Sequence, residues 1–416
     1  MAELSPWPQA ALRGLLEVLP GFAFDSAEFT PDPKRGMPLI RIRDLRSTST
    51  TLHFVGKFDR RYLVRNGDTI VGMDGDFEIA RWRGSEALLN QRVCRLRALA
   101  TDRLCDDFVL HRLEPELRRL HGGTGATTVK HLSTKQIEAL EIPLPPLAEQ
   151  RKIAAILSSV DETIEKTEAV IAQLDVVKMA MLEELLTRGI PGRHSRFKQT
   201  EIGEVPADWE VHQVGQLGEV QTGLAKNKNN RVQHVDEVPY LSVANVQDGW
   251  LDLDHVKRVR ADAATIERFR LRVGDVLFCE GGDADKVGRG AVWSGGLDPC
   301  LHQNHVFVVR PDSRRLLPEF LSAFRASSRG RRYFLDCSKQ TTNLASINSS
   351  QLRAMPLALP SVAEQAEIVR AVDSIERRCS AERDCLGLLV KSKAALSSAL
   401  LSGEVRTSRE AGVECS

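Results

Sequence analysis

Residues 226–231, with the sequence Lys-Asn-Lys-Asn-Asn-Arg, combine two kinds of polar chemistry in one short segment. Lysine and arginine neutralise phosphate groups, whereas asparagine can make two hydrogen bonds to the edge of an adenine. The segment follows Gly223, and an equivalent loop follows Gly21. The alternative interpretation is a solvated polar loop. We predict that the nucleic-acid contacts of this loop are Lys226, Lys228, Asn229 and Arg231.

Other segments offer similar chemistry. Residues 338–343, Ser-Lys-Gln-Thr-Thr-Asn, form a second polar loop, and its counterpart lies around Gly123–Thr128. Glycines flank Lys286 and Arg289, and because glycine has no side chain the backbone there could approach a phosphate closely. A basic run at Arg329–Arg332 is interpreted as phosphate contact or helix surface. The remaining predicted contacts are Arg60, Arg61, Arg81, Arg83, Thr124, Thr127, Lys339, Gln340, Thr342 and Asn343.

The chain lacks the sequence motifs of several enzymes that act on DNA. It has no GxxxxGK[ST] phosphate loop and no Asn/Asp-Pro-Pro-aromatic tetrad. His121–Gly125 resembles a glycine-rich phosphate loop, but no clear strand precedes it. Asp74, Asp76 and Glu78 could suggest a metal site, yet the glycines among them favour a turn. Trp82 is interpreted as core rather than as a base-stacking residue. We expect no catalytic residue and no metal site.

A tandem repeat supplies the elements that would position these loops. Leu147–Gln150 opens a long proline-free stretch, and Val362–Gln365 opens another 215 positions later. In both stretches apolar residues step by four and three, which is the pattern of a coiled-coil seam. The matched seams suggest that each helix pairs with the other, although pairing between chains is an alternative. The predicted packing residues are Ile153, Leu157, Val160, Ile164, Ile171, Leu174, Met181, Leu185, Ile368, Val372, Ile375, Leu386, Leu389, Leu396 and Leu400.

The repeat extends into the segments that precede the two helices. Trp7 aligns with Trp209, and Asn66-Gly67-Asp68 aligns with Val273-Gly274-Asp275. Short β-like runs separated by Gly- and Asp-rich turns predict two mixed α/β heads. The fold class is therefore α+β, with two heads and two long antiparallel helices in a pseudo-two-fold repeat. The predicted boundaries are 1–145 (first head), 146–188 (first helix), 189–208 (polar linker), 209–360 (second head), 361–403 (second helix) and 404–416 (tail).

Composition adds little to the functional argument. The net charge is +1, so any nucleic-acid binding must use local basic patches. The eight cysteines show no metal-binding spacing, and together with the lack of a signal-like N-terminus this favours a cytoplasmic location. We also expect no apolar run long enough to span a bilayer.

Several segments, taken in order, resemble the specificity subunit of type I restriction-modification systems. In the first half these are Phe22–Ser26, Pro38–Leu45, Asn66–Asp68 and Ile142–Gln150. The second half repeats the pattern with Pro239–Leu241, Gly274-Asp275, Leu357–Pro360 and Glu364-Gln365. The resemblance runs from Trp7 to Gly403, with Ser361 and Val362 in place of the usual Pro-Leu before the second helix.

This resemblance implies a DNA-reading protein that neither cuts nor methylates. Each head would be a target recognition domain for one half of a split, asymmetric site in double-stranded DNA. The helices would set the unread spacer and dock modification (methyltransferase) subunits, two in number, which would carry S-adenosylmethionine; this chain would bind no cofactor. A motor-nuclease restriction subunit would complete the complex. Two alternatives are a specificity module of another restriction-modification type and a two-headed, protein-binding coiled-coil scaffold.

Overall fold

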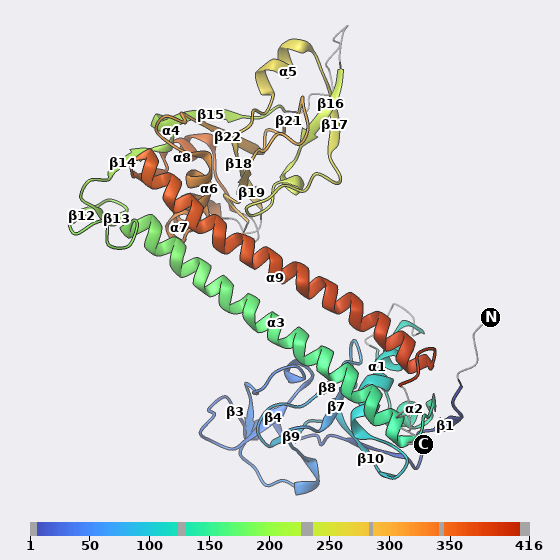
Figure 1. Cartoon of the computed structure of the whole chain (residues 1–416). Coiled ribbons are helices and arrows are strands. Elements are labelled where there is room, and N and C mark those ends of the chain that lie inside the picture. Colours follow the sequence, from blue (N-terminus) through green and yellow to red (C-terminus); the bar gives the residue numbers. More distant parts are fainter. Residues whose placement is uncertain (1–5, 124–129, 226–235, 283–285, 341–344, 408–416) are drawn as a thin grey trace, which may run out of the picture. The chain divides into compact units, whose positions relative to one another are not determined.

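The computed structural model of the chain describes residues 6–123, 130–225, 236–282, 286–340 and 345–407. These residues form two compact units, and each unit contains one head and one half of each long helix (Figure 1). Unit 1 comprises residues 1–168 and 385–416, and unit 2 comprises residues 169–384. The division therefore falls inside both helices, whereas the predicted boundaries placed each helix in a domain of its own.

The first head is built mostly of short strands. Its elements are β1 (Gln9–Ala11), β2 (Leu16–Pro20), η1 (Ser26–Glu28), β3 (Phe29–Thr30), β4 (Met37–Ile40), η2 (Ile42–Asp44), β5 (His53–Phe54), η3 (Arg60–Tyr62), β6 (Leu63–Val64), β7 (Thr69–Gly72), β8 (Ile79–Arg81), β9 (Ala87–Leu89), β10 (Val93–Ala98), α1 (Asp106–Gly123), α2 (Thr134–Glu138) and β11 (Glu141–Pro143). The first long helix, α3, spans Leu147–Arg188, close to the predicted 146–188.

The second head repeats this order with insertions. Its elements are β12 (Phe197–Thr200), β13 (Gly203–Pro206), β14 (Glu210–Gln213), α4 (Val214–Leu217), β15 (Gly218–Thr222), β16 (Asp236–Leu241), η4 (Val243–Asn245), β17 (Lys257–Ala261), α5 (Ala263–Phe269), β18 (Val276–Cys279), β19 (Gly281–Gly282), β20 (Gly290–Val292), β21 (Leu301–His302), β22 (Val306–Pro311), α6 (Pro318–Ala326), α7 (Ser328–Cys337), β23 (Lys339–Gln340), β24 (Ala345–Ser346), α8 (Ser349–Ala354) and β25 (Pro356–Leu359). The second long helix, α9, spans Val362–Ser402, against a predicted 361–403.

The two heads share one sheet topology. The order β2-β10-β7-β8 in the first head matches β15-β22-β18-β20 in the second, and the pair β1-β11 matches β14-β25. Each head also contains a parallel strand pair, β4 with β9 in the first head and β16 with β21 in the second. Buried runs of β-branched and aromatic residues such as Val306–Val309 favour central strands. The turns before β7 and β18 each use a glycine with positive φ, Gly67 and Gly274, at 94° and 90°.

The start of each long helix is fixed to its head by the same two side chains. Trp7 Nε1 donates to Glu149 at 3.3 Å, and Trp209 Nε1 donates to Glu364 at 3.3 Å. The next residue, Gln150 or Gln365, is fully buried and bonds only to backbone groups of the head and of the loop before the helix. The Glu-Gln pair predicted from sequence as a helix start is therefore also the joint between helix and head.

The segment that follows each long helix contacts the start of the other long helix. In unit 1, Arg406 lies beyond the end of α9 and donates to both oxygens of Glu149, at 2.7 and 2.9 Å. In unit 2, His194 lies beyond the end of α3 and bonds to Glu364 at 2.7 Å, and its other ring nitrogen lies 3.1 Å from Asp208. Different nitrogen-bearing side chains, Arg406 and His194, thus occupy equivalent places in the two units.

Within each unit the two helices run antiparallel. In unit 2, Lys178 bonds to Glu376 at 2.7 Å and Arg383 bonds to Asp175 at 2.7 Å. In unit 1, Lys393 bonds to Asp161 at 2.6 Å. The Lys178–Glu376 and Lys393–Asp161 pairs are related by the 215-residue repeat, so each half of the chain contributes the lysine of one pair and the acid of the other.

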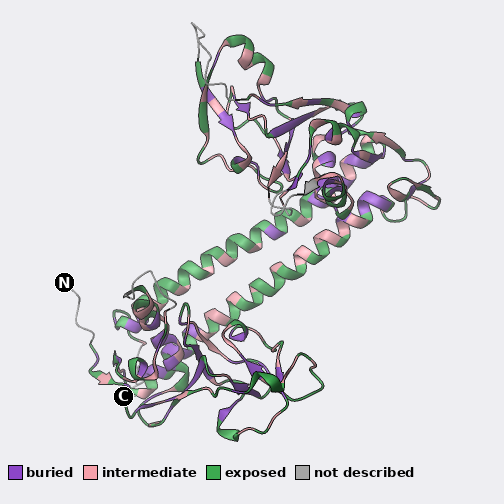
Figure 2. Cartoon of the chain, turned by 180° about the vertical axis from the view of Figure 1, so that it is seen from behind, coloured by how far each residue is buried: buried purple, intermediate pink, exposed green. Residues whose placement is uncertain are grey.

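The predicted packing residues differ in burial along the helices (Figure 2). Residues near the heads are buried in the core clusters of their units: Ile153, Leu157, Leu185, Ile368, Val372 and Leu400. Residues further from the heads are half-buried, because two helices alone cover only one face of each other: Val160, Ile164, Ile171, Leu174, Met181, Ile375, Leu386 and Leu389. Leu396 is exposed, with 38% of its surface accessible, so the packing prediction is wrong for this residue.

Two other predictions need correction. Residues 189–208, predicted to be a polar linker, contain the antiparallel hairpin β12–β13. The expectation that no segment is apolar enough to span a bilayer is also wrong. The helix α9 is long enough to span one, and its most apolar stretch has a mean hydropathy of 1.3. One such helix is weak evidence for a membrane span, and both ends of α9 pack into the cores of the heads.

Candidate nucleic-acid interface

A small sheet in the second head brings two predicted segments together. After β18 the chain continues into β19, which pairs antiparallel with β24, and β24 pairs with β23. The Ile347 N–H donates to the Glu280 carbonyl at 2.8 Å and extends this pairing. The backbone at Gly281-Gly282 therefore lies in one sheet with the backbone at Lys339-Gln340.

The predicted cation Arg289 lies on the chain segment that returns from this sheet to β20. The Cys279 N–H donates to the Arg289 carbonyl at 2.8 Å, and the Gly288 N–H donates to the Cys279 carbonyl at 3.2 Å. Gly288 has φ +70°, and a Cβ there would lie 2.3 Å from the Phe334 ring, so only glycine fits. Burial raises the pKa of the Cys279 thiol, and a hydrogen bond with Arg289 partly opposes this rise. Arg289 is thus half-buried and held at the edge of the hairpin, with Lys286 on the same segment.

A tight turn at residues 247–250 packs beside this hairpin. The Gly249 N–H donates to the Gly290 carbonyl at 2.9 Å, and the Gln247 N–H donates to the Trp250 carbonyl at 3.0 Å. Gly249 has φ +89°, a conformation that glycine adopts without strain. The turn presents Trp250 to solvent with 59% of its surface accessible. Sequence reasoning missed this residue, although the Asp-Gly turn before the tryptophan was a usable signal.

Two arginines bind the turn through the side chain of Asp248. Arg325, on α6 and almost fully buried, donates to one oxygen of Asp248 at 2.6 Å. Arg331, on α7, donates to the other oxygen at 2.8 Å. Burial pushes the pKa of Asp248 upward, but Arg325 and Arg331 outweigh this and hold the pKa below its usual value. One carboxylate therefore faces two guanidinium groups.

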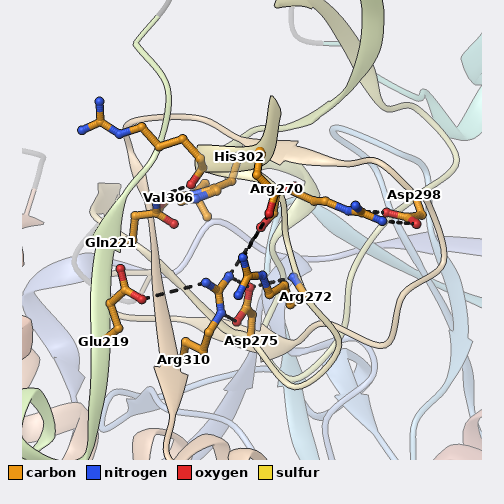
Figure 3. A network of polar contacts seen from close by, with 11 residues as sticks. Glu219, Gln221, Arg270, Arg272, Asp275, Asp298, His302, Val306 and Arg310 are labelled. Carbon is orange, nitrogen blue, oxygen red and sulfur yellow. Dashed lines mark hydrogen bonds and ion pairs between the residues drawn. The ribbon is translucent and has the colours of Figure 1, made fainter. Parts of the chain in front are cut away.

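The buried Asp275, which precedes β18, forms an ion pair with Arg310 of β22 (Figure 3). Arg310 donates to both oxygens of Asp275, each at 2.7 Å, and the pKa of Arg310 is raised mainly by these hydrogen bonds. Asp275 also accepts from the Arg272 N–H at 2.8 Å. In the first head Asp68 accepts from Arg97 and from the Arg65 N–H. The pair recurs in both heads, and so it serves the fold rather than recognition of one ligand.

His302 lies next to this pair and is specific to the second head. Its Nδ1 bonds to the Val306 carbonyl at 2.7 Å (Figure 3). Burial lowers the pKa of His302 to about 4, partly opposed by this bond and by Asp275. The equivalent residue of the first head is Leu89. The Phe22 N–H donates to the Leu89 carbonyl, as the Leu224 N–H donates to the His302 carbonyl. His302 is therefore neutral at pH 7 and part of the core.

The first head has the same backbone frame with different polar groups. The Met73 N–H donates to the Arg92 carbonyl, as Glu280 N–H donates to the His305 carbonyl in the second head. Next to Met73, Asp74 bonds to Arg92 at 2.8 Å and to His131 at 2.7 Å. In the second head Glu280 itself bonds to His305. The acidic group identified from sequence at Asp74 is thus an ion-paired turn residue.

The four predicted arginines of the first head do not form one cluster of ion pairs. Arg81 bonds to Asp107 of α1 at 2.6 Å, and Arg83 bonds to Glu165 of α3 at 2.9 Å. Arg61 contacts Tyr62 and Asp59, and Arg60 is an exposed residue of η3. Arg81 and Arg83 already have carboxylate partners on helices, so a contact with phosphate would have to compete with those partners.

Several predicted contacts cannot be placed. Lys226, Lys228, Asn229, Arg231, Thr124, Thr127, Thr342 and Asn343 lie outside the described residues, and for Lys339 and Gln340 only the backbone is described. His121-Gly122-Gly123, considered as a possible phosphate loop, instead forms the end of α1. The basic run at 329–332 lies on α7, where Arg329 lies 3.9 Å from Glu183.

Comparison with known proteins gives consistent matches over nearly the whole chain. The family model described as "Type I restriction modification DNA specificity domain" matches residues 5–175 and 206–384. The EcoBI specificity subunit of Escherichia coli is 29% identical over 381 residues, which cover 89% of this chain and 79% of that protein. The MjaVIII specificity subunit of Methanocaldococcus jannaschii is 26% identical over 362 residues, covering 85% and 82%.

Solved structures share the fold. The S subunit of a type I restriction-modification system from M. genitalium superposes with a TM-score of 0.60 at 13% identity, covering 96% of this chain and 97% of that one. A chain from a study of complex assembly and conformational transition of the type I R-M system gives a TM-score of 0.54 at 19% identity, covering 97% and 100%. The predicted tandem repeat of two mixed α/β heads with two long helices is confirmed by these matches.

Proposed function

The chain belongs to the type I restriction-modification DNA specificity family, and from this we propose that it selects the DNA sequence on which a methyltransferase and restriction complex acts. Each head contacts one half of a split, asymmetric site in double-stranded DNA. The chain itself supplies no catalytic group, and catalysis resides in partner subunits. This role requires access to DNA inside the cell.

The observation that carries this proposal is one backbone frame bearing two different sets of side chains. In the first head the position beside the common hairpin holds Asp74, Arg92 and His131. In the second head it holds Glu280 and His305, and the neighbouring turn carries Trp250. Base recognition depends on the donor, acceptor and apolar groups presented to the grooves. Two heads with one frame and different groups therefore favour two different half-sites.

The long helices support the proposed docking of methyltransferase subunits. Apolar side chains are exposed along both helices: Ile156, Val170, Val176 and Val177 on α3, and Leu388, Val390 and Leu396 on α9. These side chains offer apolar contacts to a protein that docks along the helices. In this proposal the partner subunits, two in number, carry S-adenosylmethionine, and a motor-nuclease subunit joins the complex.

The decisive experiment is co-expression of this chain with the candidate methyltransferase in a host that lacks other adenine methylation. Sequencing of the host DNA should show methylated adenines at one split, asymmetric motif. The matched control is the methyltransferase expressed without this chain, which should leave the motif unmodified. If the two proteins associate and no motif is modified, the proposal is wrong, and a protein-binding scaffold becomes the better interpretation.

Binding to the identified motif should weaken steeply with salt. Each neutralised phosphate releases counterions, so the logarithm of the affinity falls linearly with the logarithm of the salt concentration. Fluorescence anisotropy of a labelled duplex, measured with the assembled complex at several salt concentrations, checks this point. A salt-independent association would argue against phosphate contacts.

A further inference from the structure

Trp250 differs from every other tryptophan of the chain in its exposure. The sequence contains five tryptophans, and all five are described by the structure. Trp7, Trp82, Trp209 and Trp293 are at most 5% exposed, whereas Trp250 is 59% exposed. An indole in water gives up the large burial energy that aromatic side chains contribute in a core. The exposed ring is therefore available for contact with a partner outside the chain.

Contacts with neighbouring elements fix the backbone of the turn that carries Trp250. Three interactions hold it: the Gly249 N–H bond to Gly290, the Gln247 N–H bond to the Trp250 carbonyl, and the Asp248 ion pairs. One of those ion pairs uses Arg325, which is 3% exposed. Burying a guanidinium is costly unless it is paired, so the Arg325–Asp248 pair strongly favours this one position of the turn. A turn whose backbone is already fixed loses little backbone entropy when it binds a partner.

Cationic side chains lie on the elements next to the turn that carries Trp250, and Asp252 and Asp254 follow the tryptophan in the chain. Arg325 and Arg331 share the single carboxylate of Asp248, and Lys178 also lowers the pKa of Asp248. The hydrogen bond from Gly249 to Gly290 places the turn beside the segment that carries Lys286 and Arg289. Among the described residues no carboxylate lies within ion-pair distance of Arg289. An exposed aromatic ring with arginines on the adjoining elements fits duplex DNA, in which apolar bases and sugars lie between phosphates.

The first head has no equivalent of this tryptophan. The short helices η2 and η4 correspond, because the Arg41 N–H donates to Asp44 as the Ser242 N–H donates to Asn245. Counting forward from these helices places Ser49 where the second head has Trp250. The feature is thus specific to one head, as expected for recognition of one half-site and not for a contact that both heads share.

We propose that Trp250 packs against the bases or sugars of the DNA half-site bound by the second head and contributes to its recognition. This inference rests on the proposed function of the chain. The ring supplies an apolar contact, and exposed cations on adjoining elements, such as Arg331, contact the flanking phosphates. Apolar wedges at base steps and apolar contacts with thymine methyl groups are both known ways in which proteins recognise a DNA sequence. A surface for the methyltransferase subunit is the competing explanation of the exposed ring.

Oxidative footprinting with mass spectrometry tests the proposal in the assembled complex with methyltransferase. Hydroxyl radicals oxidise exposed tryptophans, and the four buried tryptophans of the same chain serve as internal controls. We expect Trp250 to be oxidised in the complex without DNA and to be protected when a duplex with the methylated motif is added. A duplex in which only the second half-site is scrambled should not protect it.

Three results would overturn the proposal. Protection by the methyltransferase alone would identify a partner surface instead. Unchanged oxidation in a complex that has bound the motif would show that Trp250 does not touch DNA, while the proposed function would stand. Failure of the complex to bind any duplex would remove the proposed function itself, and this inference with it.

Substitutions give an independent readout. Trp250→Ala should weaken binding to the motif by about tenfold, the size expected for loss of one aromatic contact with a base. Trp250→Phe should lose less, because it retains an aromatic ring. Val273→Ala is the matched control, since Val273 is another exposed apolar residue of the same head, 77% exposed, on a different turn. Equal affinities for Trp250→Ala and Val273→Ala would contradict the proposal.

Discussion

Replacing Gln365 by leucine should destabilise the second head by removing one buried amide. The Gln365 side chain accepts from the Leu317 N–H at 2.8 Å and donates to the carbonyls of Arg315 and Pro360 at 2.8 and 2.9 Å. Leucine has a similar shape but satisfies none of these groups. Each bond contributes about 1 kcal/mol net, and a buried group left without a partner costs more, so we expect a loss of roughly 3 kcal/mol.

The first head contains a matched test of the same reasoning. Gln150 accepts from the Cys105 N–H at 2.9 Å and donates to the carbonyls of Arg103 and Pro145 at 2.7 and 2.8 Å. Gln150→Leu should therefore cost a similar amount, but in the first head. The two sites share no contacts, and so the effects should add in the double variant.

Hydrogen exchange with mass spectrometry of the full chain gives the local readout, and denaturant titration gives the total loss. Gln365→Leu should speed exchange of the Leu317 amide and leave the Cys105 amide unchanged, while Gln150→Leu should do the reverse. A comparable loss of stability with unchanged exchange at Leu317 would refute the reasoning, because the cost would then come from packing and not from the lost hydrogen bonds.

Gln365→Glu separates hydrogen bonding from shape. The carboxylate keeps an acceptor for the Leu317 N–H but faces two carbonyl oxygens that the amide donated to. The protonated form can donate to one of them, so the folded pKa of this carboxyl should lie above its unfolded value. Stability relative to the wild type should therefore be higher near pH 5 than near pH 7. A pH-independent difference would argue against this account of the joint.

Three further predictions concern the core, the helix pair and the spacer. The folded pKa of His302 is about 4, below its unfolded value of about 6.5, so the unfolding free energy should fall as pH is lowered from about 6.5 to about 4, by at most ~1.4 kcal/mol per pH unit; His302→Leu, which copies Leu89, should remove this slope in denaturant titrations. Lys178→Met and Lys393→Met should each destabilise by about 1 kcal/mol or less, because each lysine faces two carboxylates, Glu376 and Asp248 for Lys178, and Asp161 and Glu114 for Lys393; an unchanged melting temperature in either variant would contradict this. Deletion of one heptad from both long helices should shorten the unread spacer of the methylated motif and keep both half-sites, which sequencing of modified DNA would show; an altered half-site with the old spacer would refute the role of the helices as a ruler.

The helices and the repeat could be predicted because they depend on local periodicity. An apolar residue every three or four positions produces one apolar face on a helix, whatever the rest of the chain does. Ile153 and Leu157, with their counterparts Ile368 and Val372, are all buried in the structure. The same pattern predicted more burial for Leu396 than the structure shows. Periodicity shows that a residue shares a face with its neighbours but not whether another element covers that face.

The candidate interface was less predictable, because its residues come together only through sheet pairing. Arg81 and Arg83 belong to a basic segment in sequence, yet their partners Asp107 and Glu165 lie on two helices far along the chain. The position of Trp250 depends on Asp248, Arg325 and Arg331, which no local pattern connects. An ion pair between distant residues depends on the folded backbone and leaves no spacing that the sequence alone reveals.

The sequence by itself determined that the chain is a duplication, where its long helices begin and end, and which family it resembles. These properties follow from residue order and from interactions within a few turns of helix. Only the tertiary structure decided which cations already have acidic partners, which glutamines join helix to head, and which tryptophan faces solvent. Those outcomes depend on burial and on contacts between segments far apart in the sequence, such as Glu149 and Arg406, which are 257 residues apart, and burial is a property of the folded chain.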